Sequence, residues 1–397
     1  MARFLLGVNY WPRSSAMAMW SQLDLGEIDE DFARIAALGL DVVRFFLLWE
    51  AFQPAPDALD ANAMRKLATV LECAHAHGLR TMPTLFCGHM SGVNWLPDWT
   101  LDPVSPPSPR FRTVSNGRVS PYGIGDFYTG EFLEIQRTFV RALGARLRDH
   151  ASILAWDLGN EFSNLRVPNS IDDAAHWSAA LAHDLFESSN LGVTGGLHGE
   201  DLSEDRNIRP SSIAELWKFS TMHGYPVYSS FARSPSDPEV VPFLCETTAT
   251  FAEKPVLFSE FGNPARPPGE VAAGGIASLD EDEMAAYACE VLERLQARGA
   301  LGAFWWCWTD YAPELATVPP FDLAPHELRF GLIRSDGTEK PVARALSAFA
   351  AECRPLTEPK PLQLNEADYY AGLPATLPDA YRAYTETHDF APPERRH

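Results

Sequence analysis

FLLGVNY (Phe4–Tyr10) and VVRFFLLW (Val42–Trp49) are two short apolar runs rich in residues that favour β-strands. Between them, Asp29–Leu38 has the apolar periodicity of a helix, and Gly39 supplies a signal for its C-terminal end. A strand, a helix and a second strand in this order are typical of a βα unit in a parallel sheet. This first unit therefore predicts the α/β class.

The same alternation continues along the chain and gives eight apolar runs in all. Eight such units predict a (β/α)8 TIM barrel, formed as a single domain by residues 1–353. The further runs are Leu79–Phe86, Ile153–Leu158, Leu191–Leu197, Phe219–Met222, Pro255–Ser259 and Leu301–Trp308. Segments of helical periodicity that accompany them are Ala61–His77, Gly130–Arg148, Glu281–Arg298 and Val342–Ala351.

Two segments are expected to lie outside the regular barrel. Residues 354–397 are rich in proline and weakly periodic, which predicts an irregular C-terminal tail that packs on the barrel or is partly disordered. The Pro- and Ser-rich segment DPVSPPSPR (102–110) follows the third run, and we expect it to cover one end of the barrel.

The charge of the chain argues against several classes of partner. Its 397 residues include 53 Asp and Glu against 32 Lys and Arg, which gives a formal net charge of −21. A protein this acidic is repelled by nucleic acid and by anionic membranes. The first residues, MARFLLGVNYWP, contain no apolar stretch of signal-peptide length, and no segment approaches a membrane span, so we expect a cytoplasmic protein.

The six cysteines are scattered, without a CxxC pair and without the Cys and His spacing of a zinc site. We therefore expect free buried thiols, no metal and no cofactor. The cysteines are Cys73, Cys87, Cys245, Cys289, Cys307 and Cys353.

Residues at the C-terminal ends of the strands carry the functional argument, because barrel enzymes build their sites there. In this chain those positions are rich in aromatic side chains, amides and carboxylates, which suits a sugar. They are Asn9, Tyr10, Trp11, Arg44, Trp49, Glu50, His89, Asn160, Glu161, His198, Glu200, Asp201, His223, Tyr225, Glu260, Trp305, Trp306 and Trp308.

Glu161 in LAWDLGNEF and Glu260 in PVLFSEFG stand out, because each ends an otherwise apolar strand. In a retaining glycosidase two carboxyls lie about 5 to 5.5 Å apart, and one protonates the leaving oxygen while the other attacks the anomeric carbon. The acid must stay protonated while the nucleophile stays charged, and we expect Arg44 and Tyr225 to donate to Glu260 and keep it ionised. The alternative is that each glutamate is only a strand-end surface charge.

Four short motifs at strand ends resemble those of clan A glycoside hydrolases. Within that clan the chain most resembles family 5 and its mannosidase-like members, over residues 4 to about 353. The resemblance implies a retaining β-glycosidase on a (β/α)8 barrel. The motifs are N-E at 160–161, H-G-Y at 223–225, S-E-F-G at 259–262 and W-W-C-W at 305–308.

Carried over residue by residue, the resemblance implies that Glu161 is the acid/base and Glu260 the nucleophile. It makes Arg44 the strand-two arginine that supports Glu260. It makes Asn160 the neighbour of the acid/base that hydrogen-bonds the 2-hydroxyl of the sugar. For Arg44 the alternative is an interior ion pair unconnected with substrate.

The resemblance also gives His223 and Tyr225 as the H-x-Y pair, and Trp306 as the platform under the sugar before the cleaved bond. Trp305 alternates away from Trp306 along the strand, so we expect it to pack in the core. For His223 the alternative is a structural histidine. Strand-end position alone adds two further candidates for binding substrate, His89 and His198.

The expected function is an exo-acting β-mannosidase for short oligosaccharides. A cytoplasmic enzyme would trim imported oligosaccharides, and the motifs are those of mannosidase-like members. The loops that begin at DPVSPPSPR (102–110) and HGED (198–201) would wall off the non-reducing end of the sugar. An open cleft across the whole rim would contradict this expectation.

Other functions remain as alternatives. An endo-β-mannanase, β-glucosidase, β-galactosidase or transglycosylase of the same clan would use the same residues. A metal-dependent barrel hydrolase would need H-x-H after the first strand, where this chain has Asn9 and Tyr10. A non-catalytic sugar-binding barrel would usually have lost one of the two carboxylates.

Overall fold

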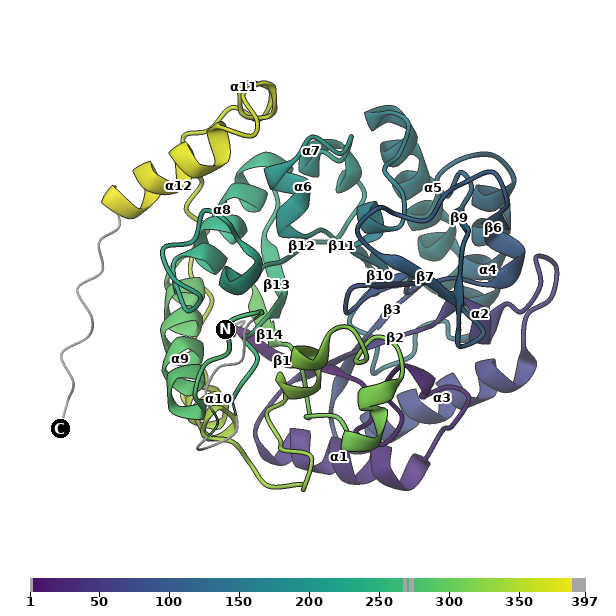
Figure 1. Ribbon diagram of the computed structural model, residues 1–397, viewed down its shortest axis with the longest axis horizontal. Helices are drawn as coiled ribbons and strands as arrows, with labels where there is room; N and C mark the ends of the chain where they lie inside the picture. Colours follow the sequence, from purple (N-terminus) through teal and green to yellow (C-terminus); the bar gives the residue numbers. More distant parts are fainter. Residues whose placement is uncertain (1–2, 267–269, 271–274, 388–397) are drawn as a thin grey trace.

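A barrel of eight parallel strands forms the centre of the computed structural model, which describes residues 3–266, 270 and 275–387 (Figure 1). Barrel strands pair in chain order, and the circle closes where Lys218 N donates to Val193 O at 2.8 Å. The predicted (β/α)8 fold and its eight strands are confirmed. The strands are Leu5–Tyr10 (β1), Val42–Phe46 (β2), Arg80–Thr84 (β3), Trp156–Asn160 (β10), Val193–Gly196 (β11), Ser220–His223 (β12), Val256–Phe261 (β13) and Gly302–Trp305 (β14).

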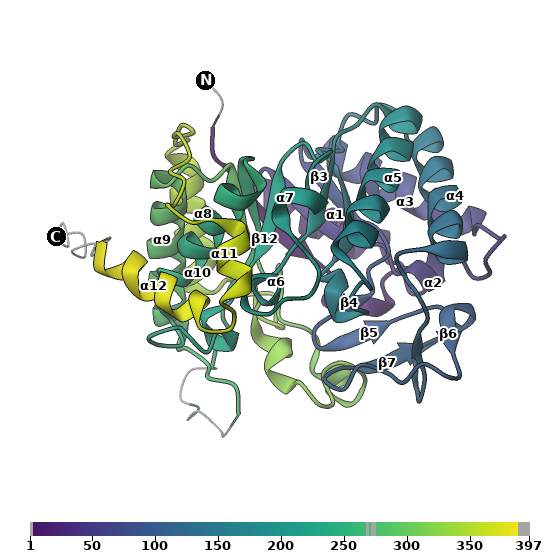
Figure 2. The same cartoon turned by 90° about the horizontal axis from the view of Figure 1, so that it is seen from above.

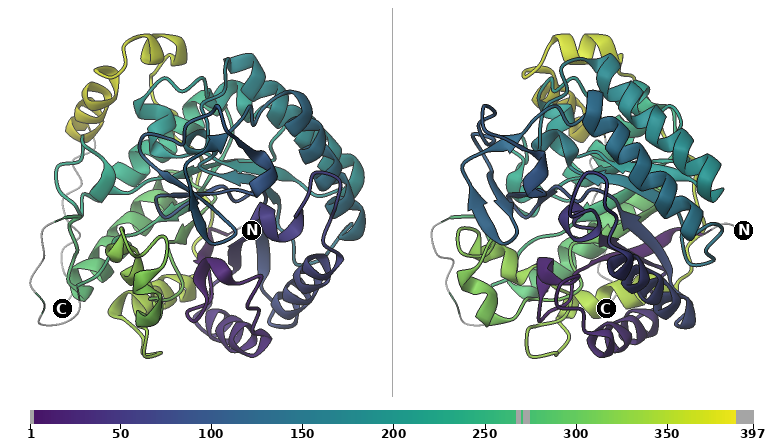
Figure 3. Two further views of the ribbon diagram at one scale, coloured as in Figure 1. Left: turned by 45° about the vertical axis from the view of Figure 1, so that its right-hand side comes forward. Right: turned by 90° about the vertical axis from the view of Figure 1, so that its right-hand side faces the viewer.

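Helices surround the barrel and follow the strands, as the two views of Figure 3 show. The long ones are Leu25–Ala37 (α1), Ala61–Ala76 (α3), Gly130–Arg146 (α4), Ile171–Ser189 (α5), Val240–Ala252 (α8), Glu281–Ala297 (α9) and Pro341–Ala351 (α10). Shorter ones on the strand-to-helix side are Trp49–Phe52 (α2), Gly199–Ser203 (α6) and Pro210–Ile213 (α7).

Helix α1 begins at Leu25, earlier than the apolar pattern indicates. The side chain of Asp24 caps it by accepting hydrogen bonds from the backbone N–H groups of Gly26 and Glu27. The capping bonds fix the start of the first turn, where Leu25 and Gly26 are exposed, whereas Ile28 at the end of that turn is buried.

Apolar side chains fill the barrel near the N-terminal ends of its strands. Phe304 of β14 lies in this cluster. Gly7 of β1 makes room for it, because a Cβ atom at that position would lie 2.4 Å from Cδ1 of the Phe304 ring. The buried members of the cluster are Val42, Met82, Leu154, Ala155, Phe219, Leu257 and Phe304.

The long segment after β3 folds into two small sheets, one of four strands and one of two, over the other end of the barrel. Figure 2 places these sheets on the same side as the loop after β14. The prediction that the segment containing DPVSPPSPR covers one end of the barrel is borne out in this placement. The small strands are His89–Met90 (β4), Val93–Trp95 (β5), Leu101–Asp102 (β6), Arg112–Ser115 (β7), Arg118–Ser120 (β8) and Gly123–Ile124 (β9).

The C-terminal segment is more regular than the sequence predicts. Residues 356–365 lack helix and strand, but Glu366–Ala371 (α11) and Thr376–Thr387 (α12) are helices, drawn in yellow in Figure 1. The Tyr370 hydroxyl donates to the Asp201 carbonyl at 2.8 Å, and the Tyr384 hydroxyl donates to Glu246 at 2.8 Å. Tyrosines thus attach this segment to the barrel. Residues 388–397 of the predicted tail lie outside the described residues.

The cysteines are free, as expected, but not all of them are buried. Cys87, Cys245 and Cys307 are buried, whereas Cys289 and Cys353 are exposed. Within the described ranges, no helix is both long and apolar enough to cross a membrane.

Candidate active site

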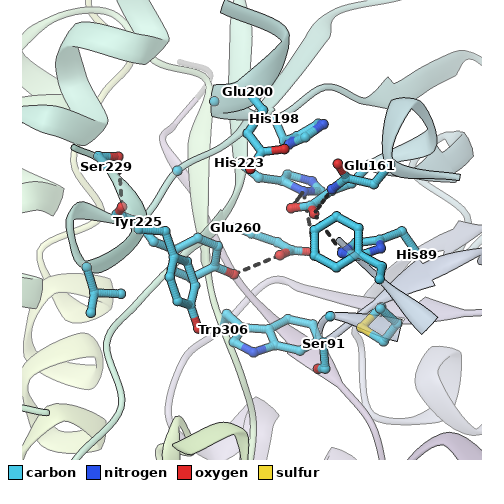
Figure 4. A pocket seen from close by; sticks show the side chains of 18 of the residues that line it. His89, Ser91, Glu161, His198, Glu200, His223, Tyr225, Ser229, Glu260 and Trp306 are labelled. Carbon is cyan, nitrogen blue, oxygen red and sulfur yellow. Dashed lines mark hydrogen bonds and ion pairs between the residues drawn. The ribbon is translucent and has the colours of Figure 1, made fainter. Parts of the chain in front are cut away.

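A cavity of about 750 Å³ lies at the C-terminal ends of the barrel strands (Figure 4). Its size falls in the range typical of small-molecule sites. Among the residues with a predicted catalytic or substrate-binding role, Arg44 alone does not line the cavity, because it lies fully buried beneath it. The predicted residues that line it are His89, Asn160, Glu161, His198, His223, Tyr225, Glu260 and Trp306.

Glu161 directly follows β10 and has a left-handed backbone, with φ of 47°. This conformation is uncommon for a residue with a side chain, and such strain often occurs at functional sites. The backbone N–H of Glu161 donates to Gly196 O at 3.1 Å, and Asn164 Nδ2 donates to Glu161 Oε2 at 3.3 Å. The turn and these bonds direct the carboxylate into the cavity.

Glu260 lies in β13 and receives two strong donors. Arg44 Nη1 lies 2.5 Å from its Oε1, and the Tyr225 hydroxyl donates to its Oε2 at 2.7 Å. Burial, followed by the charge of Glu260, raises the pKa of Tyr225 well above its usual value, so this hydroxyl remains a donor. The predicted contacts of Arg44 and Tyr225 with Glu260 are therefore present.

Arg44 is the centre of a buried polar network. Its Nη2 donates to Asn160 Oδ1 at 2.8 Å, its Nη1 donates to Asn9 Oδ1 at 3.0 Å, and its Nε donates to Asp157 Oδ2 at 2.8 Å. Burial acts to lower the pKa of Arg44, but the charges of Asp157 and Glu260 raise it above its usual value. The network keeps a permanent positive charge under Glu260 and fixes the amide of Asn160.

The carboxylates of Glu161 and Glu260 approach each other across the cavity. One oxygen of each and one ring nitrogen of His223 all lie within 4.8 Å of one another. His223 Nδ1 is 3.2 Å from Glu161 Oε1 and 3.6 Å from Glu260 Oε1. His223 therefore contacts both carboxylates rather than serving only as a structural histidine.

Three histidines surround Glu161, and the close-up in Figure 4 shows His89 and His198 on either side of it. His89 Nε2 lies 3.7 Å from Glu161 Oε2, and His198 Nε2 bonds to the Ser163 hydroxyl at 2.9 Å. Burial acts to raise the pKa of Glu161, but positive charge on His198 and a hydrogen bond from His223 lower it below its usual value. Burial also lowers the pKa of His89, which favours its neutral form.

The three tryptophans at the end of β14 have different surroundings. Trp306 lines the cavity, as the prediction of a sugar platform requires. Trp305 is fully buried, and its Nε1 donates to Phe330 O at 2.9 Å. Trp308 is also fully buried. The expectation that Trp305 packs in the core is therefore confirmed.

Several residues of the site are absent from the sequence-based assignment. Asp157 holds Arg44, and Asn9, recognised only as a strand-end residue, also binds it. Asp157 could have been noticed as the one charge inside the apolar run before Glu161. Glu327 lines the cavity from the loop after β14 and follows no strand, so strand-end reasoning could not find it.

A metal ion is not needed to explain this arrangement. Glu161, His223 and Glu260 are near enough to share an ion, and so are Asp29, Cys73 and His77 on the surface. In the cavity, however, Arg44 and Tyr225 already occupy the oxygens of Glu260. A fixed guanidinium beside the carboxylate opposes binding of a second cation.

Neither the protein-family models nor the curated proteins contain a match to this chain. The exo-β-1,4-mannosidase from Opitutaceae bacterium strain TAV5 is similar in structure, with a TM-score of 0.74 and 25% identity over 88% of this chain and 60% of that one. A GH5_18 protein from Streptomyces cattleya in complex with Manβ1-4GlcNAc gives a TM-score of 0.79 and 21% identity, over 98% and 92% of the two chains. The resemblance to family 5 mannosidase-like glycoside hydrolases is confirmed.

A β-galactosidase is a more distant structural neighbour. The protein from the psychrophilic Marinomonas ef1 gives a TM-score of 0.63 and 16% identity, over 88% of this chain and 59% of that one. This chain thus spans about 60% of the length of the exo-β-1,4-mannosidase and a similar share of the β-galactosidase. The resemblance covers the barrel.

Proposed function

We propose that this protein is a retaining β-glycosidase, with Glu260 as the nucleophile and Glu161 as the general acid/base. The observation that carries the proposal is the approach of the two carboxylates, whose nearest oxygens lie within 4.8 Å. Retaining enzymes hold the two carboxyls about 5 to 5.5 Å apart, whereas inverting enzymes need about 6.5 to 9.5 Å to admit a water. The spacing here supports retention.

In the first step, a Glu260 oxygen attacks the anomeric carbon and forms a glycosyl ester while the bond to the leaving oxygen breaks. Glu161 gives its proton to that oxygen, so the alcohol departs neutral. Arg44 and Tyr225 hold Glu260 ionised and direct its free electron pair toward the sugar. Asn160 is fixed by Arg44 and offers an amide hydrogen to the 2-hydroxyl.

In the second step, the Glu161 carboxylate takes a proton from water as the water oxygen attacks the anomeric carbon. The ester bond to Glu260 breaks, and both carboxyls return to their starting states. Two displacements at one carbon retain its configuration.

Glu161 must carry a proton when substrate binds, yet positive charge on the surrounding histidines lowers its pKa. We propose that His89 is neutral at the pH of turnover, because burial lowers its pKa. His89 then no longer lowers the pKa of Glu161, whereas burial and repulsion from Glu260 both raise the pKa of this carboxyl.

We propose β-mannosides as the substrates, with removal of one terminal sugar from short oligosaccharides. The similarity to an exo-β-1,4-mannosidase supports this choice. The hydrogen bonds that Ser91 and Tyr228 donate to Glu327 join the loops beside Trp306 and support exo action. A cytoplasmic location and the division at residue 353 stay predictions.

The test is a screen of purified protein against p-nitrophenyl β-mannoside, β-glucoside, β-galactoside and β-xyloside. We expect nitrophenol release from the mannoside alone, and none with the Glu260→Ala variant. Release from another sugar would keep the mechanism and replace the substrate. No nitrophenol release from any of the four substrates would contradict exo-glycosidase action and favour an endo enzyme or a sugar-binding barrel.

A further inference from the structure

Glu327 is a buried carboxyl in the wall of the cavity, and it has no part in the proposed mechanism. It belongs to the 3₁₀ turn Pro325–Arg329 after β14, and 7% of its surface is exposed. The Ser91 hydroxyl donates to its Oε2 at 3.0 Å, and the Tyr228 hydroxyl donates to its Oε1 at 3.0 Å. The Trp306 side chain is a third donor. Glu327 therefore lies beside the proposed sugar platform.

The cavity has two chemically different ends, with the carboxylate pair between them (Figure 4). At one end, positive charge on His198 lowers the pKa of Glu161. At the other end, the charge of Glu260 raises the pKa of Glu327. The acid/base must face the leaving group, so the aglycone belongs at the end with His198. The sugar that becomes bonded to Glu260 then extends toward Trp306 and Glu327.

Three loops meet at Glu327, in the wall at this end of the cavity. Ser91 comes from the turn between β4 and β5, Tyr228 comes from the turn after β12, and Glu327 comes from the loop after β14. A second contact joins the loop after β14 to strand β7 of the same small sheet, because Arg112 Nη1 donates to Asp322 Oδ2 at 2.8 Å. A longer saccharide chain would have to pass through this junction.

The charge of Glu327 has little compensation from the protein. Within the described part of the chain, its ion-pair partner is His326 Nε2 at 3.5 Å, and burial lowers the pKa of this histidine. Burial, opposed by the three hydrogen bonds and assisted by the charge of Glu260, raises the pKa of Glu327 to about 7. A buried carboxyl that faces a cavity gains most from a ligand that hydrogen-bonds to it. Sugar hydroxyls provide such donors and acceptors.

We infer that Glu327 recognises the terminal sugar by hydrogen-bonding a hydroxyl at C3, C4 or C6 while Trp306 stacks against the ring. The Ser91–Glu327–Tyr228 junction closes the cavity behind that sugar and makes the enzyme exo-acting. This inference rests on the proposed function, because it takes the Trp306 end as the place of the glycone.

The test combines a residue deletion with hydroxyl deletions. Wild type, Glu327→Ala and Glu327→Gln are assayed on p-nitrophenyl β-mannoside and on its 3-deoxy, 4-deoxy and 6-deoxy analogues. For wild type, we expect at least one deoxy analogue to lose about 10- to 100-fold in kcat/KM. For Glu327→Ala, we expect kcat/KM on the intact mannoside to fall by a similar factor relative to wild type. On that same deoxy analogue, the kcat/KM of Glu327→Ala should equal that of wild type. Glu314→Gln, on the exposed part of the same loop, is the matched control and should behave as wild type.

A purely structural Glu327 gives a different pattern. The variant would then be slower on every substrate while all three deoxy analogues kept the same relative loss as in wild type, and this result would overturn the inference. Glu327→Gln preserves the side-chain volume and carries the test if the alanine variant fails to fold. In that case, the loss of kcat/KM from the intact mannoside to the deoxy analogue should be smaller for Glu327→Gln than for wild type.

The wild-type data alone decide the proposed function, before any variant is compared. If wild type is active on a different aryl glycoside, the deoxy analogues of that sugar are used in place of the mannosides. If wild type turns over no aryl glycoside, calorimetric titration with β-1,4-mannobiose takes the place of kinetics. Weaker binding by at least about 10-fold in Glu327→Ala would then support recognition by Glu327, and equal binding would refute it.

Discussion

The two ends of the barrel are built from the same strands but have opposite chemistry. Val42 and Arg44 of β2 lie two residues apart, so both point to the same face of the strand, into the barrel. Val42 joins the apolar cluster that contains Phe304, whereas Arg44 binds Glu260 and the buried Asp157. One end therefore contributes packing energy. The other end holds buried opposite charges that stabilise one another as ion pairs. Substitutions at the two ends should separate stability from activity.

The largest expected effect is at Glu260. Glu260→Ala removes the group that bonds to the sugar, so turnover of every substrate should fall by at least about 10⁴-fold. Initial rates on the best aryl glycoside measure this loss. Retention of more than a tenth of the activity would exclude Glu260 as the nucleophile.

Glu161→Ala should have an effect that depends on the leaving group. Glycosides with good aryl leaving groups need no proton, so their first step should survive, whereas natural disaccharides should lose most of their turnover. Azide, which needs no general base, should then attack the glycosyl ester in place of water, release Glu260 and yield a β-glycosyl azide, which NMR identifies. An α-glycosyl azide, or equal loss on both classes of substrate, would contradict the acid/base assignment.

Arg44→Met should reduce both properties. It leaves Asp157 and Glu260 buried without their cation, which costs about 3–5 kcal/mol in the free energy of unfolding. We also expect kcat to fall by about 10² to 10³-fold, because an unsupported Glu260 becomes a poorer nucleophile. Urea unfolding and steady-state kinetics measure the two losses, and unchanged stability would show that Asp157 and Glu260 do not depend on Arg44.

Phe304→Ala is the matched substitution at the apolar end. It should cost about 3–5 kcal/mol of stability through the cavity that it creates, while kcat below the unfolding transition stays within about twofold of wild type. A loss of kcat comparable to that of Arg44→Met would mean that the two ends are not independent.

The smallest expected effect is a shift in pH dependence at the polar end. Burial raises the pKa of Glu161, and positive charge on His198 is the largest influence that lowers it. His198→Gln removes that charge, so the pKa of Glu161 should rise and the acid should stay protonated to higher pH. The alkaline limb of kcat/KM should therefore move to higher pH, whereas the exposed His183→Gln should leave it in place. A shift to lower pH would contradict this reading of the histidines.

The sequence predicts the parts of this protein that repeat. Apolar strands and the residues at their ends follow a period that single-chain reasoning detects, which is why β2, Arg44 and Glu260 could be placed. The two C-terminal helices were missed because tyrosine hydroxyls hold them as much as an apolar face does. Tyr370 and Tyr384 donate to groups on distant parts of the chain, and no local pattern reports such bonds.

Glu327 was missed for a related reason. It lies in a loop, and its importance comes from Ser91, Tyr228 and Trp306, which reach it from three other places in the chain. Burial of a carboxyl by loops that meet only in the folded state leaves no periodic signal. The sequence therefore identified the proposed catalytic pair and several residues that line the cavity, but not Glu327.

The most direct test of the account is to trap the intermediate on Glu260. A 2-deoxy-2-fluoro glycosyl fluoride of the preferred sugar should form the ester and slow its hydrolysis, and mass spectrometry of the intact protein and its peptides locates the added sugar. The account predicts one sugar per chain, carried on Glu260 and absent from Glu260→Ala. Turnover of good substrates without any trapped sugar, or a label on another residue, would contradict it.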